Sequence, residues 1–314
     1  MRKVLITAVG GDVGGGILRC MKEAFPGDVF WGCDIKPEVP FLTLLDRYEI
    51  VPRSNTTQYR DKIMELCRDN GITHFCPTTE EEIILWDGLR DFFERHKIAL
   101  MINKSDLIRI ATSKYKTSEF LNQHGIASPK TYLLDAYNGQ LAFPVIVKPD
   151  YGRGSSGMRM VEDEGTLETI RKTAAETLVV QQYVGSPEEE YTVGVFSDGA
   201  QTSSIAFRRT LGPGGMSVRV ETVEDEMLKK IAGQVAEALA LKGAINIQLR
   251  RENGVYYIFE INPRLSSTVR FRHKLGFKDA AWWLELLDGN FSTPDFKVKS
   301  GVVGLRYVDE VILE

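Results

Sequence analysis

Three polar side chains follow one another at the end of an apolar, strand-like segment. In "VYYIFEINPRLSST", Glu260, Asn262 and Arg264 take every second position just where a packed strand should continue. Alternate residues of a strand share a face, so Tyr256 and Ile258 are expected on the same face as Glu260 and Asn262. Carboxylate and amide oxygens suit Mg²⁺, which takes few protein ligands and completes its shell with water and substrate phosphates. The pattern favours a magnesium site, with a solvated polar face as the alternative.

The preceding run "INIQL" offers a third oxygen ligand, and the turn between the two strands decides whether that ligand reaches the site. The letters "RENG" are typical of a hairpin turn. A two-residue turn would pair Gln248 with Phe259, on the wrong face, whereas a three-residue loop over 252–254 pairs it with Ile258. Only an odd loop brings Gln248 to the face of Glu260, so we predict the three-residue loop.

A glycine-rich loop follows a strand that ends in a lysine. In "FPVIVKPDYGRGSSGM" the strand carries Lys148, and the loop after it contains Gly152, Gly154, Ser155, Ser156 and Gly157. Such a loop can place backbone N–H groups around a phosphate. It is not a Walker A loop, because Gly157 precedes Met158 and Arg159, and it is not a protein-kinase loop, in which the glycines come before the lysine. A surface lysine beside a mobile turn is the alternative.

A second glycine cluster lies near the N-terminus. The segment "VGGDVGGGILRCM" follows a strand and opens a helix, and Asp34 ends the next strand, which loosely resembles a dinucleotide-binding fingerprint. The spacing is not GxGxxG. We therefore favour a Rossmann-like shell whose loop faces some ligand over a site for NAD or FAD.

Short β runs alternate with helices over the first hundred residues, which is typical of a parallel sheet covered by helices. We expect one Rossmann-like domain over 1–105. Its expected strands are "KVLITAV", "VFWGCDI", "RYEIVP", "THFCPTT" and "IALMIN", with helices from about Gly15, near 58–69 and near 80–95.

From residue 106 onward hairpin-like strands dominate, with helices interleaved, so the second domain (106–314) is expected to be α+β. A helix comes first, and a later helix is expected over 223–241. The expected strands are "TYLL", "FPVIVKPD", "TLVVQQYV", "EYTVGVFSDG", "TSSIAFRRT" and the hairpin "INIQLRRENGVYYIFEINPR".

Composition excludes several function classes. The 314 residues are 43% hydrophobic, enough for a packed core, and carry a net charge of −4, so no basic field would hold nucleic acid. No segment approaches the roughly 20 apolar residues of a membrane span. The four cysteines lie far apart without a CxxC pair, so we expect reduced, mostly buried thiols, no zinc site and a cytoplasmic protein.

The order of these features resembles the ATP-grasp superfamily. Lys114 comes first, then Lys148 with its loop, the acidic run 188–190, and finally the hairpin. The segment "GAINIQLRRENGVYYIFEINPRLSS" is particularly similar to the large subunit of carbamoyl-phosphate synthase and its stand-alone relatives. "FCPTTEEE" looks like part of the domain that precedes the ATP-grasp region, and "SKYKTSEFLNQHGIASPK" looks like the linker helix. The resemblance implies a two-lobed ATP-grasp domain, with a first nucleotide lobe (106–185) and a metal-binding lobe (186–314).

The resemblance also implies roles for individual residues. Lys114 and Lys148 would contact nucleotide phosphates, and the loop 152–157 would fold over them. Arg264 would face the transferred phosphoryl group. The adenine hinge would be formed by Gln181, Gln182, Tyr183 and Val184, the ribose ligand would be Glu190, and the ligands of two Mg²⁺ ions (or Mn²⁺) would be Gln248, Glu260 and Asn262. Two positions depart from the family pattern, because Ser113 and Gln182 stand where acidic residues are frequent.

The implied activity is that of an ATP-dependent carboxylate–amine ligase, which makes an acyl phosphate and hands it to an amine or another nucleophile. A carbamoyl-phosphate-type partial reaction on bicarbonate and a nucleotide-binding protein without catalysis are the alternatives. The expected partners are a small carboxylate and a small amine, and a second copy of the chain in a homodimer.

Substrate-binding residues are harder to predict. Thr78, Thr79, Glu80 and Arg209 offer polarity without pointing to a substrate. Downstream of the hairpin, Arg270, Arg272 and His273 are candidates for holding an anionic substrate, with a solvated basic patch as the alternative.

Overall fold

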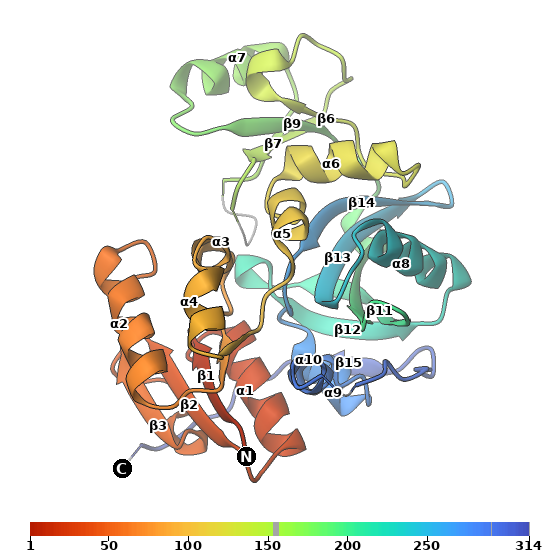
Figure 1. The fold of residues 1–314 in the computed structure, drawn as a ribbon. Helices are drawn as coiled ribbons and strands as arrows, with labels where there is room; N and C mark the ends of the chain where they lie inside the picture. Colours follow the sequence, from red (N-terminus) through yellow and green to blue (C-terminus); the bar gives the residue numbers. More distant parts are fainter. Residues whose placement is uncertain (153–156, 290, 314) are drawn as a thin grey trace.

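The computed structural model describes residues 1–152, 157–289 and 291–313. Three residues of the predicted phosphate loop, Gly154, Ser155 and Ser156, lie outside the described residues. Within the described chain the strands form three sheets, of five, four and six strands. Figure 1 shows them as three regions of the molecule.

The first sheet is entirely parallel, in the order β3-β2-β1-β4-β5. Its central strand is buried along nearly its whole length, as expected where helices cover both faces. This confirms the predicted Rossmann-like sheet. Its elements are β1 (Lys3–Thr7), α1 (Asp12–Ala24), β2 (Val29–Asp34), η1 (Leu42–Leu44), β3 (Arg47–Ile50), α2 (Thr57–Asp69), β4 (His74–Cys76), α3 (Glu80–Asp87), α4 (Arg90–Arg95) and β5 (Ala99–Leu100).

The single helix expected over 80–95 is two helices. Gly88, a poor helix former, follows α3, and a new helix begins at Arg90. The start of α3 is fixed by a capping box, in which the Thr79 side chain accepts from the Glu82 backbone and the Glu82 side chain accepts from the Thr79 backbone. The expectation of one continuous helix was wrong, but its expected first residue, Glu80, is confirmed.

The second sheet is antiparallel, in the order β6-β9-β7-β8. It has its own small core, which includes Val145, Val147, Leu167 and Val180. The sheet is thus packed separately from the rest of the molecule. This region contains α5 (Ser105–Ala111), α6 (Lys114–Gln123), β6 (Thr131–Leu133), η2 (Leu134–Ala136), β7 (Val145–Pro149), β8 (Arg159–Val161), α7 (Glu164–Thr173) and β9 (Leu178–Gln182).

The third sheet is also antiparallel, in the order β14-β13-β10-β11-β12-β15. Its elements are η3 (Pro187–Glu189), β10 (Glu190–Ser197), β11 (Thr202–Leu211), η4 (Pro213–Gly215), β12 (Ser217–Val223), α8 (Glu226–Ala238), β13 (Gly243–Glu252), β14 (Val255–Asn262), α9 (Val269–Lys274), α10 (Asp279–Leu287) and β15 (Val303–Leu305).

Different helices cover the two faces of the third sheet. On one face, Leu228 and Val235 of α8 pack in a core with Ile247. On the other, Ile17 of α1 shares a core with Phe207 and with residues of α9 and α10. The parallel-sheet region and the six-stranded sheet therefore share one continuous core, which fixes their relative position.

The hairpin β13–β14 corrects the predicted register. Its turn has two residues, because Glu252 pairs with Val255. A β-bulge then shifts the register by one: Leu249 pairs with Ile258, but Gln248 pairs with Glu260. The expected three-residue loop was therefore wrong, and the bulge supplies the odd residue instead.

The bulge also changes which side chains share a face. Tyr256 and Ile258 are buried in the core beneath α8, together with Ile261. Glu260 and Asn262 point to the opposite side, where they line a cavity. The prediction that Tyr256 and Ile258 share the face of Glu260 was wrong, because it assumed uninterrupted alternation.

All four cysteine side chains are buried and none is in a disulfide. Among the helices of the described ranges, none has the length and apolar character that crossing a bilayer requires.

Candidate functional site

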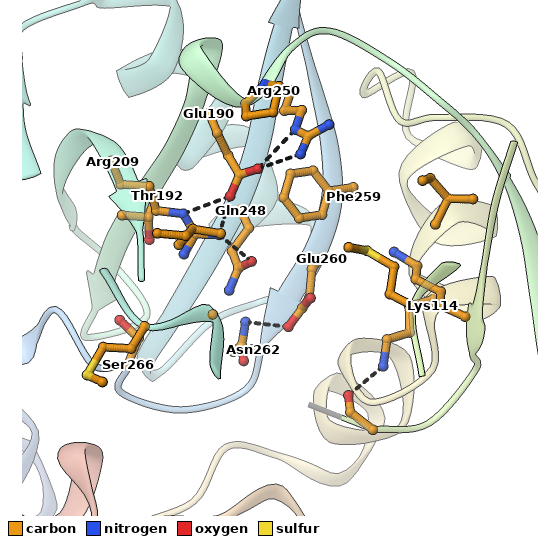
Figure 2. Close-up of a pocket in the computed structure, with 18 of the residues that line it drawn as sticks. Lys114, Glu190, Thr192, Arg209, Gln248, Arg250, Phe259, Glu260, Asn262 and Ser266 are labelled. Carbon is orange, nitrogen blue, oxygen red and sulfur yellow. Dashed lines mark hydrogen bonds and ion pairs between the residues drawn. The ribbon is translucent and has the colours of Figure 1, made fainter. Parts of the chain in front are cut away.

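A cavity of about 480 Å³ lies between the four-stranded and six-stranded sheets, with residues of both in its wall. Figure 2 shows a close-up of its lining. Among the described candidates, Gly157 does not line it. The predicted residues that do are Lys114, Lys148, Gly152, Gln181, Gln182, Tyr183, Val184, Glu190, Gln248, Glu260, Asn262 and Arg264.

Two lysines enter the cavity from the four-stranded side. Lys148 on β7 is only 8% exposed, and its Nζ donates to Gln181 Oε1 at 2.9 Å. Burial lowers the pKa of Lys148 to about 8, against the opposing attraction of Glu260. Lys114, the first residue of α6, donates from Nζ to the Gly152 carbonyl at 2.6 Å. Both are cations held where an anion can reach them.

The segment before Lys114 is fixed by a carboxylate from elsewhere in the chain. Ser113 caps α6, and its hydroxyl lies 2.8 Å from Asp150 Oδ2. Asp150 also accepts from the Tyr115 backbone N–H at 2.9 Å. The acidic residue that the family pattern expects at 113 is thus replaced by a serine that contacts Asp150.

The predicted adenine hinge begins in β9 and continues beyond it. The Gln181 side chain bridges Lys148 and Thr131, donating to the threonine hydroxyl at 2.8 Å. Gln182 accepts from the Lys130 backbone through its side chain at 3.4 Å. The apolar side chains that line the cavity include Ile146, Met158, Met160, Val184, Leu211 and Phe259. Such walls suit a flat aromatic base.

Glu190, at the start of β10, is 4% exposed and lies between two arginines. Arg209 donates to its Oε1 from Nε at 3.0 Å and from Nη2 at 2.7 Å. Arg250 donates from Nε to its Oε2 at 2.9 Å. The carboxylate is therefore already occupied in this structure.

The predicted metal ligands lie together at the end of the hairpin. Gln248 and Glu260 are directly opposite in register, and Asn246 pairs with Asn262 one step further. Asn262 Nδ2 donates to Glu260 Oε1 at 3.1 Å, which leaves Asn262 Oδ1 and Glu260 Oε2 to face a cation. Gln248 Oε1 accepts from Arg209 Nη2 at 2.8 Å, so that oxygen is shared with a guanidinium.

This donor set fits a hard cation that shares its ligands with a substrate. No group of three His, Cys, Asp or Glu side chains in the described part of the chain could hold a metal ion. A metal at this place would be coordinated by Glu260, by amide oxygens and by oxygens of a phosphate ligand. Mg²⁺ prefers such a combination of few protein ligands and substrate phosphates.

Arg264 follows the hairpin and lines the cavity with its side chain 13% exposed. Its Nη2 donates to Glu80 Oε1 at 3.1 Å, and Nη1 donates to the Leu265 carbonyl at 3.0 Å. Glu80 belongs to α3, so the parallel-sheet region orients a cation of the cavity.

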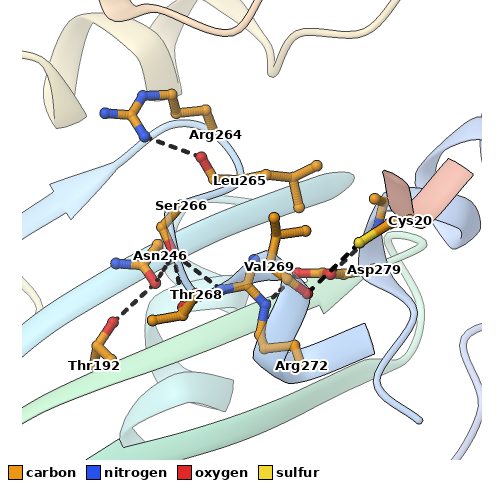
Figure 3. Close-up of polar contacts among 11 residues, drawn as sticks. Cys20, Thr192, Asn246, Arg264, Leu265, Ser266, Thr268, Val269, Arg272 and Asp279 are labelled. Atoms are coloured by element: carbon orange, nitrogen blue, oxygen red, sulfur yellow. Dashed lines mark hydrogen bonds and ion pairs between the residues drawn. The ribbon is translucent and has the colours of Figure 1, made fainter. Parts of the chain in front are cut away.

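The three downstream candidates for an anionic substrate do not line the cavity. Arg272 is fully buried, and it donates to Asp279 at 2.8 Å and to the hydroxyls of Ser266 and Thr268 (Figure 3). Arg270 and His273 both contact Glu23 on α1. The substrate-binding hypothesis for them is wrong, because each is engaged in packing between elements.

Arg272 nevertheless supports the cavity wall from behind. Ser266 and Thr268, which it contacts, both line the cavity. Ser266 also donates to Asn246 Oδ1 at 2.8 Å, and Thr192 donates to the same oxygen at 3.0 Å (Figure 3). The guanidinium thus holds the loop after Arg264 against the sheet.

The N-terminal glycines serve close packing. Asp34, which a dinucleotide site would use for a ribose, accepts instead from the Gly10 backbone at 2.9 Å. A Cβ on Gly14 would lie 2.3 Å from the Ala8 carbonyl oxygen, and one on Gly15 would lie 2.0 Å from the Phe41 ring. Within the segment 9–21, the residues that line the cavity are Asp12 and Val13, the first two of α1.

Several lining residues were not predicted, although the strands offered a signal for some. Arg250 lies two residues after Gln248, and Ile146 two residues before Lys148, so each shares the face of a predicted residue. Phe259 lines the cavity because of the bulge, which alternation could not reveal. Arg209 was named only as a polar residue, and its contact with Glu190 comes from a neighbouring strand.

Comparison with known proteins gives two family matches, which together span most of the chain. Residues 111–268 match the ATP-grasp domain, and residues 4–101 match the PylC-like N-terminal domain. The carbamoyl phosphate synthase large chain of Methanothrix thermoacetophila is 27% identical over 201 residues, which is 57% of this chain and 18% of the relative. The chain therefore spans about a fifth of that relative's length.

Solved structures share the fold at low identity. The biotin carboxylase domain of the Hydrogenobacter thermophilus 2-oxoglutarate carboxylase, in complex with MgADP, ADP and bicarbonate, has a TM-score of 0.79 at 14% identity, over 96% of this chain and 73% of that one. The L-amino acid ligase of Bacillus licheniformis has a TM-score of 0.75 at 16% identity, over 96% and 78%. With half of its residues in the ATP-grasp match, the chain belongs to the ATP-grasp family.

Proposed function

We propose that this protein is a ligase that uses Mg-ATP to phosphorylate a carboxylate and then transfers the acyl group to an amine. The observation that carries the proposal is the cavity, which Lys148, Glu260 and Asn262 line from two sheets and Arg264 lines from the segment after β14. Cations and oxygen ligands arranged in this way suit a nucleoside triphosphate with its metal.

Transfer of a phosphoryl group needs little covalent help from the protein. The transferring oxygens carry negative charge, so catalysis depends on position and on cations directed at that charge. Lys148 and Arg264 would supply the cations from opposite lobes, and Glu260 with Asn262 would hold Mg²⁺, which would neutralise negative charge on the phosphates. No side chain has to act as a nucleophile, because the substrate carboxylate attacks.

The acyl phosphate must be kept from water until the amine arrives. The small sheet has a core of its own, so its approach to the six-stranded sheet would exclude water without disturbing the shared core. Ser266, Thr268 and Asp12 also line the cavity and would face the second substrate.

The substrate classes rest on relatives. The L-amino acid ligase is named for an amino acid substrate, and the biotin carboxylase domain was solved with bicarbonate. We propose a small carboxylate and a small amine, with bicarbonate as the second candidate. That biotin carboxylase domain is described as a dimer, which supports the expectation of a homodimer here. Mn²⁺ is proposed as a replacement for Mg²⁺.

The first experiment is a thermal-shift titration with Mg-ATP, with NAD as the comparison ligand. We expect stabilisation by Mg-ATP that disappears in EDTA and in Glu260→Ala. Glu237→Ala, an exposed residue of α8, is the matched control and should respond like the unaltered chain. ADP release is then measured with pairs of carboxylates and amines, and with bicarbonate.

Stabilisation by NAD without Mg-ATP would overturn the proposal. ADP release that depends on bicarbonate alone would replace the carboxylate by the second candidate. Tight Mg-ATP binding without turnover for any pair would leave only a nucleotide-binding protein.

A further inference from the structure

One arginine near the C-terminus contacts three separate segments of the chain. Arg306 follows β15, and its Nε donates to the Ser217 carbonyl of β12 at 3.1 Å. Its Nη2 donates to the Ser267 carbonyl, in the loop after β14, at 2.7 Å. Its Nη1 forms an ion pair with Asp12, the first residue of α1. A single guanidinium therefore joins the six-stranded sheet to the parallel-sheet region.

Each of these three segments contributes to the wall of the cavity. Asp12 and Ser267 line the cavity themselves, and so does Met216, the residue before Ser217. Arg306 is not a lining residue, so it supports this wall from behind. Among the described residues, its side-chain contacts include neither a predicted phosphate-binding lysine nor a predicted metal ligand.

The strand before Arg306 holds the side chain in place. The Arg306 backbone N–H donates to the Val218 carbonyl at 2.9 Å, which continues the pairing of β15 with β12. β15 lies against α9 (Figure 1), and a Cβ on Gly304 would be 2.7 Å from the Phe271 ring of that helix. The Arg306 guanidinium lies over the same ring, 5.5 Å from its centroid. Backbone pairing and the aromatic contact thus orient the guanidinium before any ligand arrives.

The chemistry of these contacts requires an arginine. A guanidinium directs its donors along fixed directions in one plane, whereas a lysine ammonium is a compact point charge. Burial raises the pKa of Asp12, and the charge of Arg306 opposes that rise. Asp12 Oδ2 is buried and has no hydrogen-bond partner in the described chain. Without Arg306, the carboxylate at the cavity wall would lose its cation, and the wall would lose its anchor.

We propose that Arg306 is a positioning residue for the amine substrate, because it fixes Asp12 and Ser267 in the wall that the amine would contact. This inference rests on the proposed function, since it presumes an amine at that wall. The two family matches, over 4–101 and 111–268, do not extend to Arg306, so neither assigns it a role.

The test compares the intact chain with Arg306→Gln, Arg306→Lys and Arg219→Gln. Arg219 is the matched control, because it lies on β12 beside β15 but forms an ion pair with Glu221 at 2.8 Å. Steady-state ADP release gives the KM for Mg-ATP and the KM for the amine. The carboxylate probes are bicarbonate and the standard amino acids, and the amine probes are ammonia and the same amino acids.

Hydrogen exchange without substrate measures the protection of the backbone over 265–269 directly. Melting temperatures are recorded for every variant. Arg306→Lys keeps the positive charge and serves as the test variant if Arg306→Gln does not fold.

We expect Arg306→Gln to raise the KM for the amine by at least about tenfold and to change the KM for Mg-ATP by less than about twofold, because only the amine wall loses its anchor. Hydrogen exchange over 265–269 should become faster. Arg306→Lys should also raise the KM for the amine, since one ammonium cannot serve three separated acceptors. Arg219→Gln should match the intact chain.

Three results would overturn the inference while the proposed function stands. The first is a KM for the amine in Arg306→Gln equal to that in Arg219→Gln, and the second is a KM for Mg-ATP that rises as much as the KM for the amine. The third is unchanged hydrogen exchange over 265–269. An intact chain that releases no ADP with any of these probes overturns the proposed function, and the inference with it.

Discussion

Two carboxylates in this molecule, one buried and one half-buried, show how the same group can serve structure or function. Glu82, in the parallel-sheet region, is 3% exposed and accepts from the Tyr59 hydroxyl, from Thr7 at 2.8 Å and from Thr79 at 2.9 Å. Glu260, in the third sheet, accepts among the described residues only from Asn262, and it lines a cavity of about 480 Å³. Buried donors use the acceptor capacity of Glu82, whereas Glu260 keeps acceptor capacity that faces the cavity.

The difference lies in what surrounds each group. Thr78, beside Glu82, borders a space of only about 10 Å³, too small for a ligand. Polar residues in a strand-end motif therefore indicate chemistry only where a cavity leaves some of their hydrogen-bonding capacity unused.

The largest effect is expected for Asn262→Ala. Loss of a proposed metal ligand should lower the rate of ADP release by at least about 10²-fold to 10³-fold, because the charge on the transferring phosphoryl group would no longer be neutralised. The melting temperature should stay near that of the unaltered chain. Asn138→Ala, in an exposed loop, is the control. Retained turnover in Asn262→Ala would mean that Asn262 is not a ligand of a catalytic metal.

Glu82→Ala should lower stability and leave nucleotide binding unchanged, the opposite of what is expected for Asn262→Ala. Its buried donors, Tyr59 and Thr7 among them, would lose their acceptor, which costs about 3 kcal/mol of the free energy of unfolding. Urea denaturation measures this loss, and the affinity for Mg-ATP should not change. The neighbouring Glu81→Ala is the control, since Glu81 is exposed and accepts from Ser54 at 3.0 Å. A weaker Mg-ATP affinity in Glu82→Ala would contradict the purely structural role of Glu82.

Lys148 should make nucleotide affinity depend on pH. Its pKa is lowered by burial to about 8, so the ammonium is lost above that pH and the affinity for Mg-ATP should fall about tenfold per pH unit. Calorimetry between pH 7 and 9.5 measures the profile, and Lys148→Met should flatten it. An intact chain with a flat profile would mean that the lysine does not face the phosphates.

The same pKa predicts the opposite trend for stability. Between about 8 and the ordinary value of 10.5, the unfolded chain holds more of the Lys148 proton than the folded chain does. The free energy of unfolding therefore rises with pH in this window, and the cost of burying the charge is present in full below it. Lys148→Met without nucleotide should unfold no more easily than the intact chain at pH 7.

The smallest effect is expected for Thr79→Ala. The Thr79 hydroxyl caps α3 by accepting from the Glu82 backbone at 3.3 Å, and loss of a cap costs about 1 kcal/mol. Thr79→Ser keeps the hydroxyl and should retain most of that stability. Urea denaturation distinguishes the two, and equal losses would mean that the methyl group, not the cap, matters.

Much of the fold was predictable because it follows from local patterns. The alternation of strands and helices in the first hundred residues predicted the parallel sheet, whose strands β1 to β5 all fall within the expected runs. Composition and the N-terminal glycines predicted no feature of the fold beyond this parallel sheet. The break at Gly88 was missed, because a continuous helical pattern outweighed one glycine.

The candidate site was less predictable where it depends on contacts between strands. Lys148, Glu260 and Arg264 stand in recognisable motifs, and all line the cavity. The position of Arg209 beside Glu190 is set by the pairing of β10 with β11, which no local pattern contains. Likewise, the exclusion of Arg272 follows from its burial against Asp279, which only packing determines.

The bulge in the hairpin has a consequence for how this gene tolerates insertions and deletions. Phe259 has no partner in the described pairing between β13 and β14, whereas Ile258 pairs with Leu249 and Glu260 with Gln248. Deleting the codon of Phe259 would thus preserve every remaining pair, while deleting either neighbouring codon would remove a paired residue. Length variation among natural and engineered versions of this hairpin should therefore be found at position 259.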